Sequence, residues 1–194
     1  MLDARSIFLK IAAICAIIAP VLMLGIDSFV LFTNERFAWT IGMYLAFVLF
    51  VPAVIGFTYM LVNEGSGLAI FGGLLAFWGA MAGASMQAMF RTHAVLEEQG
   101  MHAAVEQLRG TLKLVLSTQS IGLGWPLGLI LLAVAYYTVR RTIVLPILLA
   151  AAAVLFPIGR IAGSEVAVIA SGALFVPAFW MIGKQLYSLA NNLE

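Results

Sequence analysis

FPIGRIAGSE, residues Phe156–Glu165, is the stretch that decides the fold, because it divides a long apolar run in two. The run extends from Ile143 to Gly183, and its only charged residues are Arg160 and Glu165. A bilayer crossing needs about 20 apolar residues, so the run is long enough for roughly two crossings. Charged residues at or near membrane depth are expensive and often mark functional sites. The stretch therefore predicts a membrane hairpin with a candidate site at its turn.

The composition places the whole chain in the membrane class. Its 194 residues are 63% hydrophobic and 10% charged, with a mean hydropathy of +1.08. Soluble domains carry about 25% charged residues, so a soluble core could not bury this much apolar surface. The net charge of +1 gives no reason to expect a nucleic-acid partner, which needs a clustered basic surface. We expect an integral membrane protein whose first partner is the lipid bilayer.

Short polar or helix-breaking turns divide the rest of the chain into apolar segments. The first of these is longer than the about 7–15 apolar residues of a signal peptide, so it is predicted to be a membrane helix. Short turns make neighbouring helices antiparallel, and six crossings place both termini on one side. We predict one all-α domain over residues 1–194, with six transmembrane helices at about residues 7–32, 38–62, 68–90, 114–138, 143–159 and 166–189.

One substantial polar segment, Arg91–Lys113, separates the third and fourth predicted helices. Its apolar residues recur at the spacing of one helix face: Met101, Val105, Leu108 and Leu112. We expect a short amphipathic helix that lies along the membrane interface, with Gly100 and Gly110 at its ends.

The predicted helix at residues 68–90 carries a face of small residues that includes Gly72, Gly79 and Gly83. Small residues three or four positions apart let another helix approach closely. Packing inside the bundle is the favoured interpretation. A homo- or hetero-oligomer that docks on this face is the alternative.

Orientation rests on the distribution of Lys and Arg. Five of these residues fall on the predicted side of the termini and five on the other, so the count alone does not decide. The basic N-terminus and the pair Arg140 and Arg141 in a very short turn favour both termini in the cytoplasm. Aromatic residues near predicted helix ends, such as Trp39 and Tyr136, fit an interfacial belt.

Polar side chains gather near the helix ends on the side opposite the termini, within about 5–8 Å of each end. Arg160 suits an anionic or carboxylate ligand because of its planar guanidinium, and Asp27 or Glu165 would pair with it or exchange protons. The simpler interpretation, a clasp between Arg160 and Glu165 at the turn, stays open. The predicted ligand site, with residues 91–113 as a lid, comprises Asp27, Gln87, Arg91, Gln119, Arg160 and Glu165.

The sequence contains little evidence for an enzyme or for a metal site. No G-x-S-x-G or H-E-x-x-H motif occurs, so an enzyme with a dispersed site is the least favoured function. Met89, His93 and His102 offer thioether and imidazole groups, which suit copper, but their spacing matches no metal motif. They are weak metal candidates, and we expect no cofactor.

The closing hairpin resembles part of a known group of proteins. LFPIGRIAG, residues Leu155–Gly163, followed by a plain apolar last helix, is similar to the end of small six-helix bacterial inner-membrane proteins of unknown function. The resemblance covers this hairpin alone. It implies a helical bundle in a bacterial inner membrane and supplies no activity or site residue.

Two functions follow. The first is binding or transport of a small anionic or amphiphilic molecule, including a lipid, through the polar pocket. The second is a structural or regulatory subunit that packs on a partner through the glycine face of residues 68–90. A cavity that touches Arg160 would favour the first function, and a filled interior would favour the second.

Overall fold

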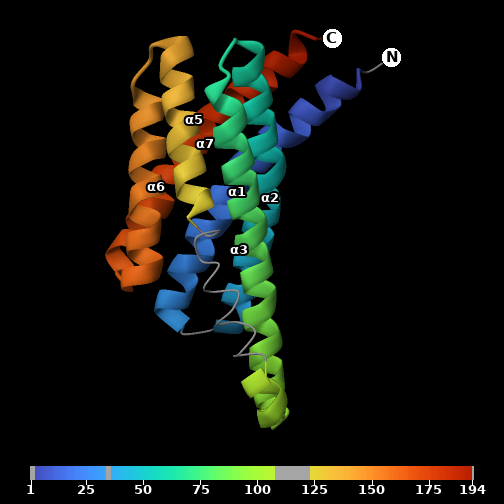
Figure 1. The fold of residues 1–194 in the computed structure, drawn as a ribbon, viewed down its shortest axis with the longest axis vertical. Coiled ribbons are helices and arrows are strands. Elements are labelled where there is room, and N and C mark those ends of the chain that lie inside the picture. The colour runs from blue at the N-terminus through green and yellow to red at the C-terminus, as the bar shows by residue number, and fades with distance from the viewer. Residues whose placement is uncertain (1–2, 34–35, 108–122, 194) are drawn as a thin grey trace.

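The computed structural model describes residues 3–33, 36–107 and 123–193, which form long helices and no strand. The first residues of α1 and the last residues of α7 lie at the same end of the bundle (Figure 1). Residues 102–107 are also helical. The long helices are α1 (Ala4–Thr33), α2 (Arg36–Asn63), α3 (Leu68–Glu98), α5 (Gly124–Arg140), α6 (Val144–Ala162) and α7 (Glu165–Asn191).

The helices form a closed ring in chain order. Each of the long helices packs on the next one, and α7 closes the ring by packing on α1. Helix α2 also contacts α5 and α7 across the interior. The first and last hairpins of the chain are therefore brought together, so residues far apart in sequence can share one site.

Four of the described helices, α1, α2, α3 and α7, are long and apolar enough to cross a membrane. Helices α5 and α6 are shorter apolar helices. Large apolar side chains also point outward, for example Phe71 at 67% and Trp78 at 61% exposure. Such an outer surface is what an integral membrane protein presents to lipid.

The predicted boundary of the third helix at residue 90 is wrong. Helix α3 continues through Arg91 to Glu98, and its last turns extend beyond the other helices (Figure 1). The change from apolar to polar residues does not break the helix, because Ala, Leu and Glu all favour helical geometry. The break comes at Gly100, whose φ of 71° suits glycine.

The predicted interfacial helix, with Gly100 as its first boundary, agrees with the structure at its start, where a separate helical piece follows the break at Gly100. The start of the polar segment, Arg91–Glu98, belongs to α3, and the separate helical piece is described from residue 102 to residue 107. Residues 108–113 lie outside the described part of the chain, as do residues 114–122 of the predicted fourth helix, which corresponds to α5. The other predicted helices agree with α1, α2, α6 and α7 to within three residues at each end.

Aromatic side chains fill the middle of the ring. Phe50 of α2 is fully buried, and its ring centroid lies 4.8 Å from that of Trp125 and 4.9 Å from that of Phe179. Phe175 of α7 joins the same cluster, with its centroid 6.3 Å from that of Phe50. Four rings from three helices thus occupy the interior where a central passage would run.

The small residues of α3 are used within the chain. Gly72 and Gly79 face α5, and a Cβ on Gly79 would lie 2.1 Å from the backbone nitrogen of Trp125. Gly83 faces α2, where a Cβ would lie 2.8 Å from the ring of Phe47. Packing inside the bundle, the favoured interpretation of the sequence, is what these contacts show. A partner could reach these glycines only by displacing α5 or α2.

We expect Gly79→Ala to destabilise the bundle by about 1–3 kcal/mol, because the added methyl group overpacks a backbone contact. Titration with sodium dodecyl sulfate from a mild detergent would measure the free energy of unfolding. Gly25→Ala is the matched control, since a Cβ there meets nothing within 4 Å. Equal losses in the two variants would contradict the close packing of α3 on α5.

Candidate functional site

Asp27 is a carboxylate buried inside the ring. It lies near the end of α1 and is only 4% exposed. An ionised carboxylate in apolar surroundings is costly unless it is paired and hydrogen-bonded. The location of its partners therefore identifies the polar centre of this end of the bundle.

Two side chains from other helices donate hydrogen bonds to Asp27. Nη2 of Arg160, on α6, lies 2.5 Å from Oδ2 of Asp27. Nε1 of Trp39, on α2, lies 3.0 Å from Oδ1. Each carboxylate oxygen thus has its own donor, and one residue ties three helices together.

Arg160 is held by more than its ion pair. Its Nη2 also lies 3.7 Å from Sδ of Met43, and its Cζ lies 5.5 Å from the ring centroid of Trp39 and 5.7 Å from that of Phe156. Both rings are within the range of cation–π attraction. We call Asp27, Trp39, Met43 and Arg160 the polar cluster.

The turn of the closing hairpin explains why Arg160 pairs with Asp27 rather than with Glu165. Gly163, with φ of 70°, ends α6, and Ser164 caps α7 by accepting a hydrogen bond from the backbone nitrogen of Ala167. Glu165 then falls in the first turn of α7 and is exposed. An acidic residue is favourable at a helix N-terminus. The predicted clasp between Arg160 and Glu165 is therefore wrong.

Gln87 lies at the same level as the polar cluster. Gly83 of α3 packs on Phe47 of the antiparallel helix α2. Gln87 lies one turn after Gly83, and Met43 lies one turn before Phe47, so both lie on the same side of this contact. Gln87 is 4% exposed, and its Oε1 accepts no hydrogen bond from any described residue. An enclosed carbonyl without a donor is costly, so Oε1 of Gln87 is a candidate acceptor at this end of the bundle.

Arg91 lies one turn further along α3. Its Cζ is 3.1 Å from the ring centroid of Phe37, and its Nη1 is enclosed without an acceptor among the described residues. The structure thus brings four of the predicted site residues to one end of the bundle. Glu165 lies exposed at the nearby turn, and Gln119 lies outside the described residues.

The two histidines among the weak metal candidates lie on either side of the break at Gly100. His93 pairs with Glu97 one turn away on α3, with Nδ1 3.6 Å from Oε2. His102 is exposed beyond the break at Gly100. Among the described residues, no group of three or more His, Cys, Asp or Glu side chains is placed to hold a metal ion.

The opposite end of the bundle holds an ion pair that the sequence analysis did not predict. Nε of Arg140, at the end of α5, lies 2.9 Å from Oε2 of Glu64, which follows α2, and Nη2 contacts Oε1. Beside it, Nε2 of Gln185 donates to the hydroxyl oxygen of Tyr136 at 2.8 Å. The signal available in the sequence was the pair of opposite charges, Glu64 and Arg140, in two turns on the same side of the predicted membrane.

We expect Glu64→Gln to lower the free energy of unfolding by only about 0.2–1 kcal/mol, because partly exposed ion pairs contribute little. The side chains of Arg140 and Glu64 are 36% and 26% exposed. Dodecyl sulfate titration would measure the change. A loss above about 2 kcal/mol would show instead that this pair behaves as a buried one.

Two pockets of the described residues, both beside Tyr59, do not include Arg160 in their lining. They lie on the outer surface, near the end that carries the termini. Comparison with protein-family models, curated proteins and solved structures gives no match. The function therefore has to be argued from the chain itself.

Proposed function

We propose that the chain is an integral protein of a bacterial inner membrane that crosses the bilayer six times, with both termini in the cytoplasm. Helix α6 has 19 residues. At about 1.5 Å per residue it is about 28 Å long, close to the about 30 Å of a hydrocarbon core. Helix α5 is also apolar. The two termini lie at the same end of the bundle (Figure 1), which supports an even number of crossings.

We further propose that this protein binds a small anionic amphiphile at Arg160. The observation that carries this proposal is the incomplete use of the Arg160 guanidinium. A guanidinium has five N–H donors, and only Nη2 bonds to a described residue. Its Nε and Nη1 are not among the buried side-chain atoms that lack a hydrogen-bond partner. The Arg160 side chain is 22% exposed. An incoming carboxylate or phosphate could bond to these donors.

The charges around Arg160 favour an anion over a cation. Asp27 neutralises Arg160, and the enclosed Nη1 of Arg91 adds a donor without an acceptor among the described residues. Among the described residues, the positive charge of Arg91 is therefore not paired with a carboxylate. The surrounding rings of Phe37, Trp39 and Phe156 would contact the apolar part of an amphiphile.

Binding fits the interior better than transport through the centre of the ring. The cluster of Phe50, Trp125, Phe175 and Phe179 fills the region beneath Arg160. The same filled interior meets the condition set from the sequence for the second candidate, a structural or regulatory subunit, in which the polar cluster only holds helices together. The two functions differ in whether an anion stabilises the protein through Arg160.

Thermal unfolding of the purified protein in dodecyl maltoside would separate the two candidates. Decanoate serves as the anionic probe and decanol as its neutral counterpart. At about 100 times its Kd, a ligand stabilises a protein by about 2.7 kcal/mol, which is a shift of several degrees. We expect this shift with decanoate and a much smaller one with decanol.

Variants test whether the stabilisation by decanoate depends on Arg160. Arg160→Gln should abolish the shift, and the double variant Asp27→Asn with Arg160→Gln tests the same loss without leaving a lone buried carboxylate. Arg141→Gln, which removes an exposed charge at the other end, should keep the full shift. A decanoate shift that survives in the double variant would contradict binding at Arg160, and its absence in the wild type would favour the structural subunit.

A further inference from the structure

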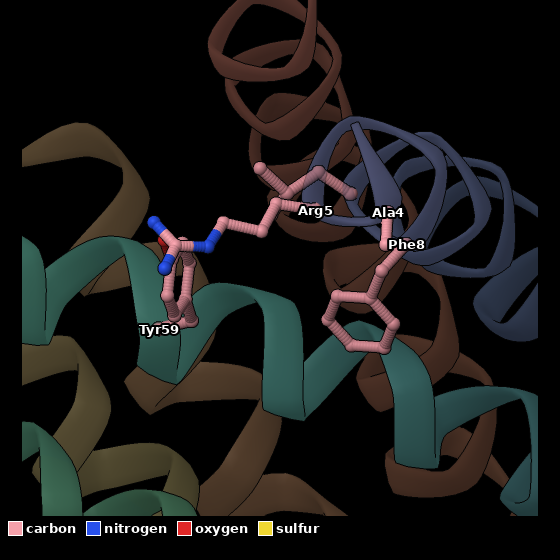
Figure 2. A pocket seen from close by; sticks show the side chains of 5 residues that line it. Ala4, Arg5, Phe8 and Tyr59 are labelled. Carbon is pink, nitrogen blue, oxygen red and sulfur yellow. The ribbon is translucent and has the colours of Figure 1, made fainter. Parts of the chain in front are cut away.

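Two apolar grooves lie side by side on the outer surface, near the end of the bundle that carries the termini. The first, of about 240 Å³, lies between α1 and α2 and is lined by Ala4, Arg5, Phe8, Leu9 and Tyr59 (Figure 2). The second, of about 450 Å³, lies between α2 and α3 and is lined by residues that include Ile55, Tyr59, Val62 and Leu74. Tyr59 belongs to both grooves and separates them.

One cation lines the first groove. The side chain of Arg5 extends from α1 toward Tyr59, and both residues line this groove (Figure 2). Arg5 is exposed, and its guanidinium makes no ion pair with the described residues. A free guanidinium above apolar walls suits a molecule with an anionic head and an apolar body.

The depth of the site fits a membrane lipid. Tyr59 lies one turn before the end of α2, and the Glu64–Arg140 ion pair lies just beyond that end. Tyrosine is enriched at the level of lipid headgroups, where its ring is apolar and its hydroxyl is polar. Headgroup phosphate and the ester-linked ends of the acyl chains would therefore meet Arg5 and Tyr59 at this level.

We propose that the two grooves hold the two acyl chains of one anionic diacyl phospholipid, with its phosphate at Arg5. Two apolar grooves on either side of a single ring match two chains joined at one headgroup. The guanidinium of Arg5, which makes no ion pair with the described residues, favours negative charge at that junction. This site is independent of Arg160, which lies at the opposite end of the bundle.

Native mass spectrometry can test the proposal on the intact purified protein. Equal amounts of a phosphatidylglycerol and a phosphatidylcholine with the same acyl chains are added, and the bound fraction of each is measured. We expect phosphatidylglycerol to be preferred. Arg5→Gln should reduce this preference about fivefold, the contribution expected of one arginine at an anionic lipid surface.

Three further arms make the test specific. Arg141→Gln removes an exposed charge at the same end but away from the grooves, and it should leave the preference unchanged. Ala4→Trp adds a large side chain at an exposed groove position, and it should lower the binding of both lipids. Glycerol 1-phosphate, which has the phosphate but no acyl chains, should not compete.

The proposal is overturned if phosphatidylcholine binds as well as phosphatidylglycerol, or if Arg5→Gln keeps the full preference. Equal losses in Arg5→Gln and Arg141→Gln would show a general surface charge effect in place of this site. Competition by glycerol 1-phosphate would show an anion site that does not use the grooves.

Discussion

Asp27→Ala is expected to lower the free energy of unfolding by about 3–5 kcal/mol, which is the cost of leaving a buried charge without its partner. In this variant the guanidinium of Arg160 and the indole nitrogen of Trp39 both lose the carboxylate that accepts their hydrogen bonds. The contact between α1 and α6 would also lose its ion pair. Titration with dodecyl sulfate, followed by circular dichroism and tryptophan fluorescence, would measure the loss.

Glu165→Ala is the matched control for Asp27→Ala. It removes a carboxylate at the same end of the bundle, but this carboxylate is exposed in the first turn of α7. Its favourable interaction with the helix dipole is worth about 0.3–1 kcal/mol. If Glu165→Ala were as destabilising as Asp27→Ala, the assignment of Asp27 as the partner of Arg160 would be wrong.

Phe50→Ala is expected to destabilise the bundle by about 3 kcal/mol. Large-to-small changes of buried aromatic residues cost about 3–5 kcal/mol through lost contacts and the cavity left behind. The lower value applies because unfolded membrane helices remain in apolar surroundings, so packing supplies most of the effect. The loss follows from the contacts of Phe50 with Trp125, Phe175 and Phe179.

Phe71→Ala provides the comparison for Phe50→Ala. Phe71 is 67% exposed on the outer surface of α3, and substitutions at such positions change stability by less than about 0.5 kcal/mol. The same dodecyl sulfate titration applies. A tolerated Phe50→Ala would mean that the centre of the ring is loosely packed, and transport through it would then regain support.

The sequence predicted the level of the polar residues in the bundle but not their partners. Asp27 and Arg160 both lie near helix ends on one side of the predicted membrane, which follows from counting residues along each helix. Their pairing depends on how each helix is rotated about its axis and on the closure of the ring by α1 and α7. Apolar side chains on every face of these helices leave that rotation undetermined.

The turn between α6 and α7 shows why Glu165 was difficult to place. It lies five residues after Arg160, and pairing across the turn is the simplest expectation from sequence. The left-handed conformation of Gly163 and the cap from Ser164 instead begin a new helix at Glu165. Local backbone geometry therefore decided between two carboxylates at one end of the bundle.

Helix α3 and Trp39 show two further limits. The predicted end of α3 followed the loss of apolar residues, but helix termination depends on backbone geometry, which changes at Gly100. Trp39 was expected to serve only as an interfacial aromatic residue, and its indole nitrogen is also a donor to Asp27. A buried carboxylate near a predicted helix end is a signal to search for such donors.

The most direct test of this account is the coupling energy between Asp27 and Arg160 in a double-mutant cycle. The variants Asp27→Asn and Arg160→Gln and their combination would be unfolded with dodecyl sulfate in parallel. For a bonded pair we expect the double variant to be more stable than the sum of the single losses predicts, by about 2–3 kcal/mol. Additive losses, within about 0.5 kcal/mol, would contradict the ion pair on which the proposed site is built.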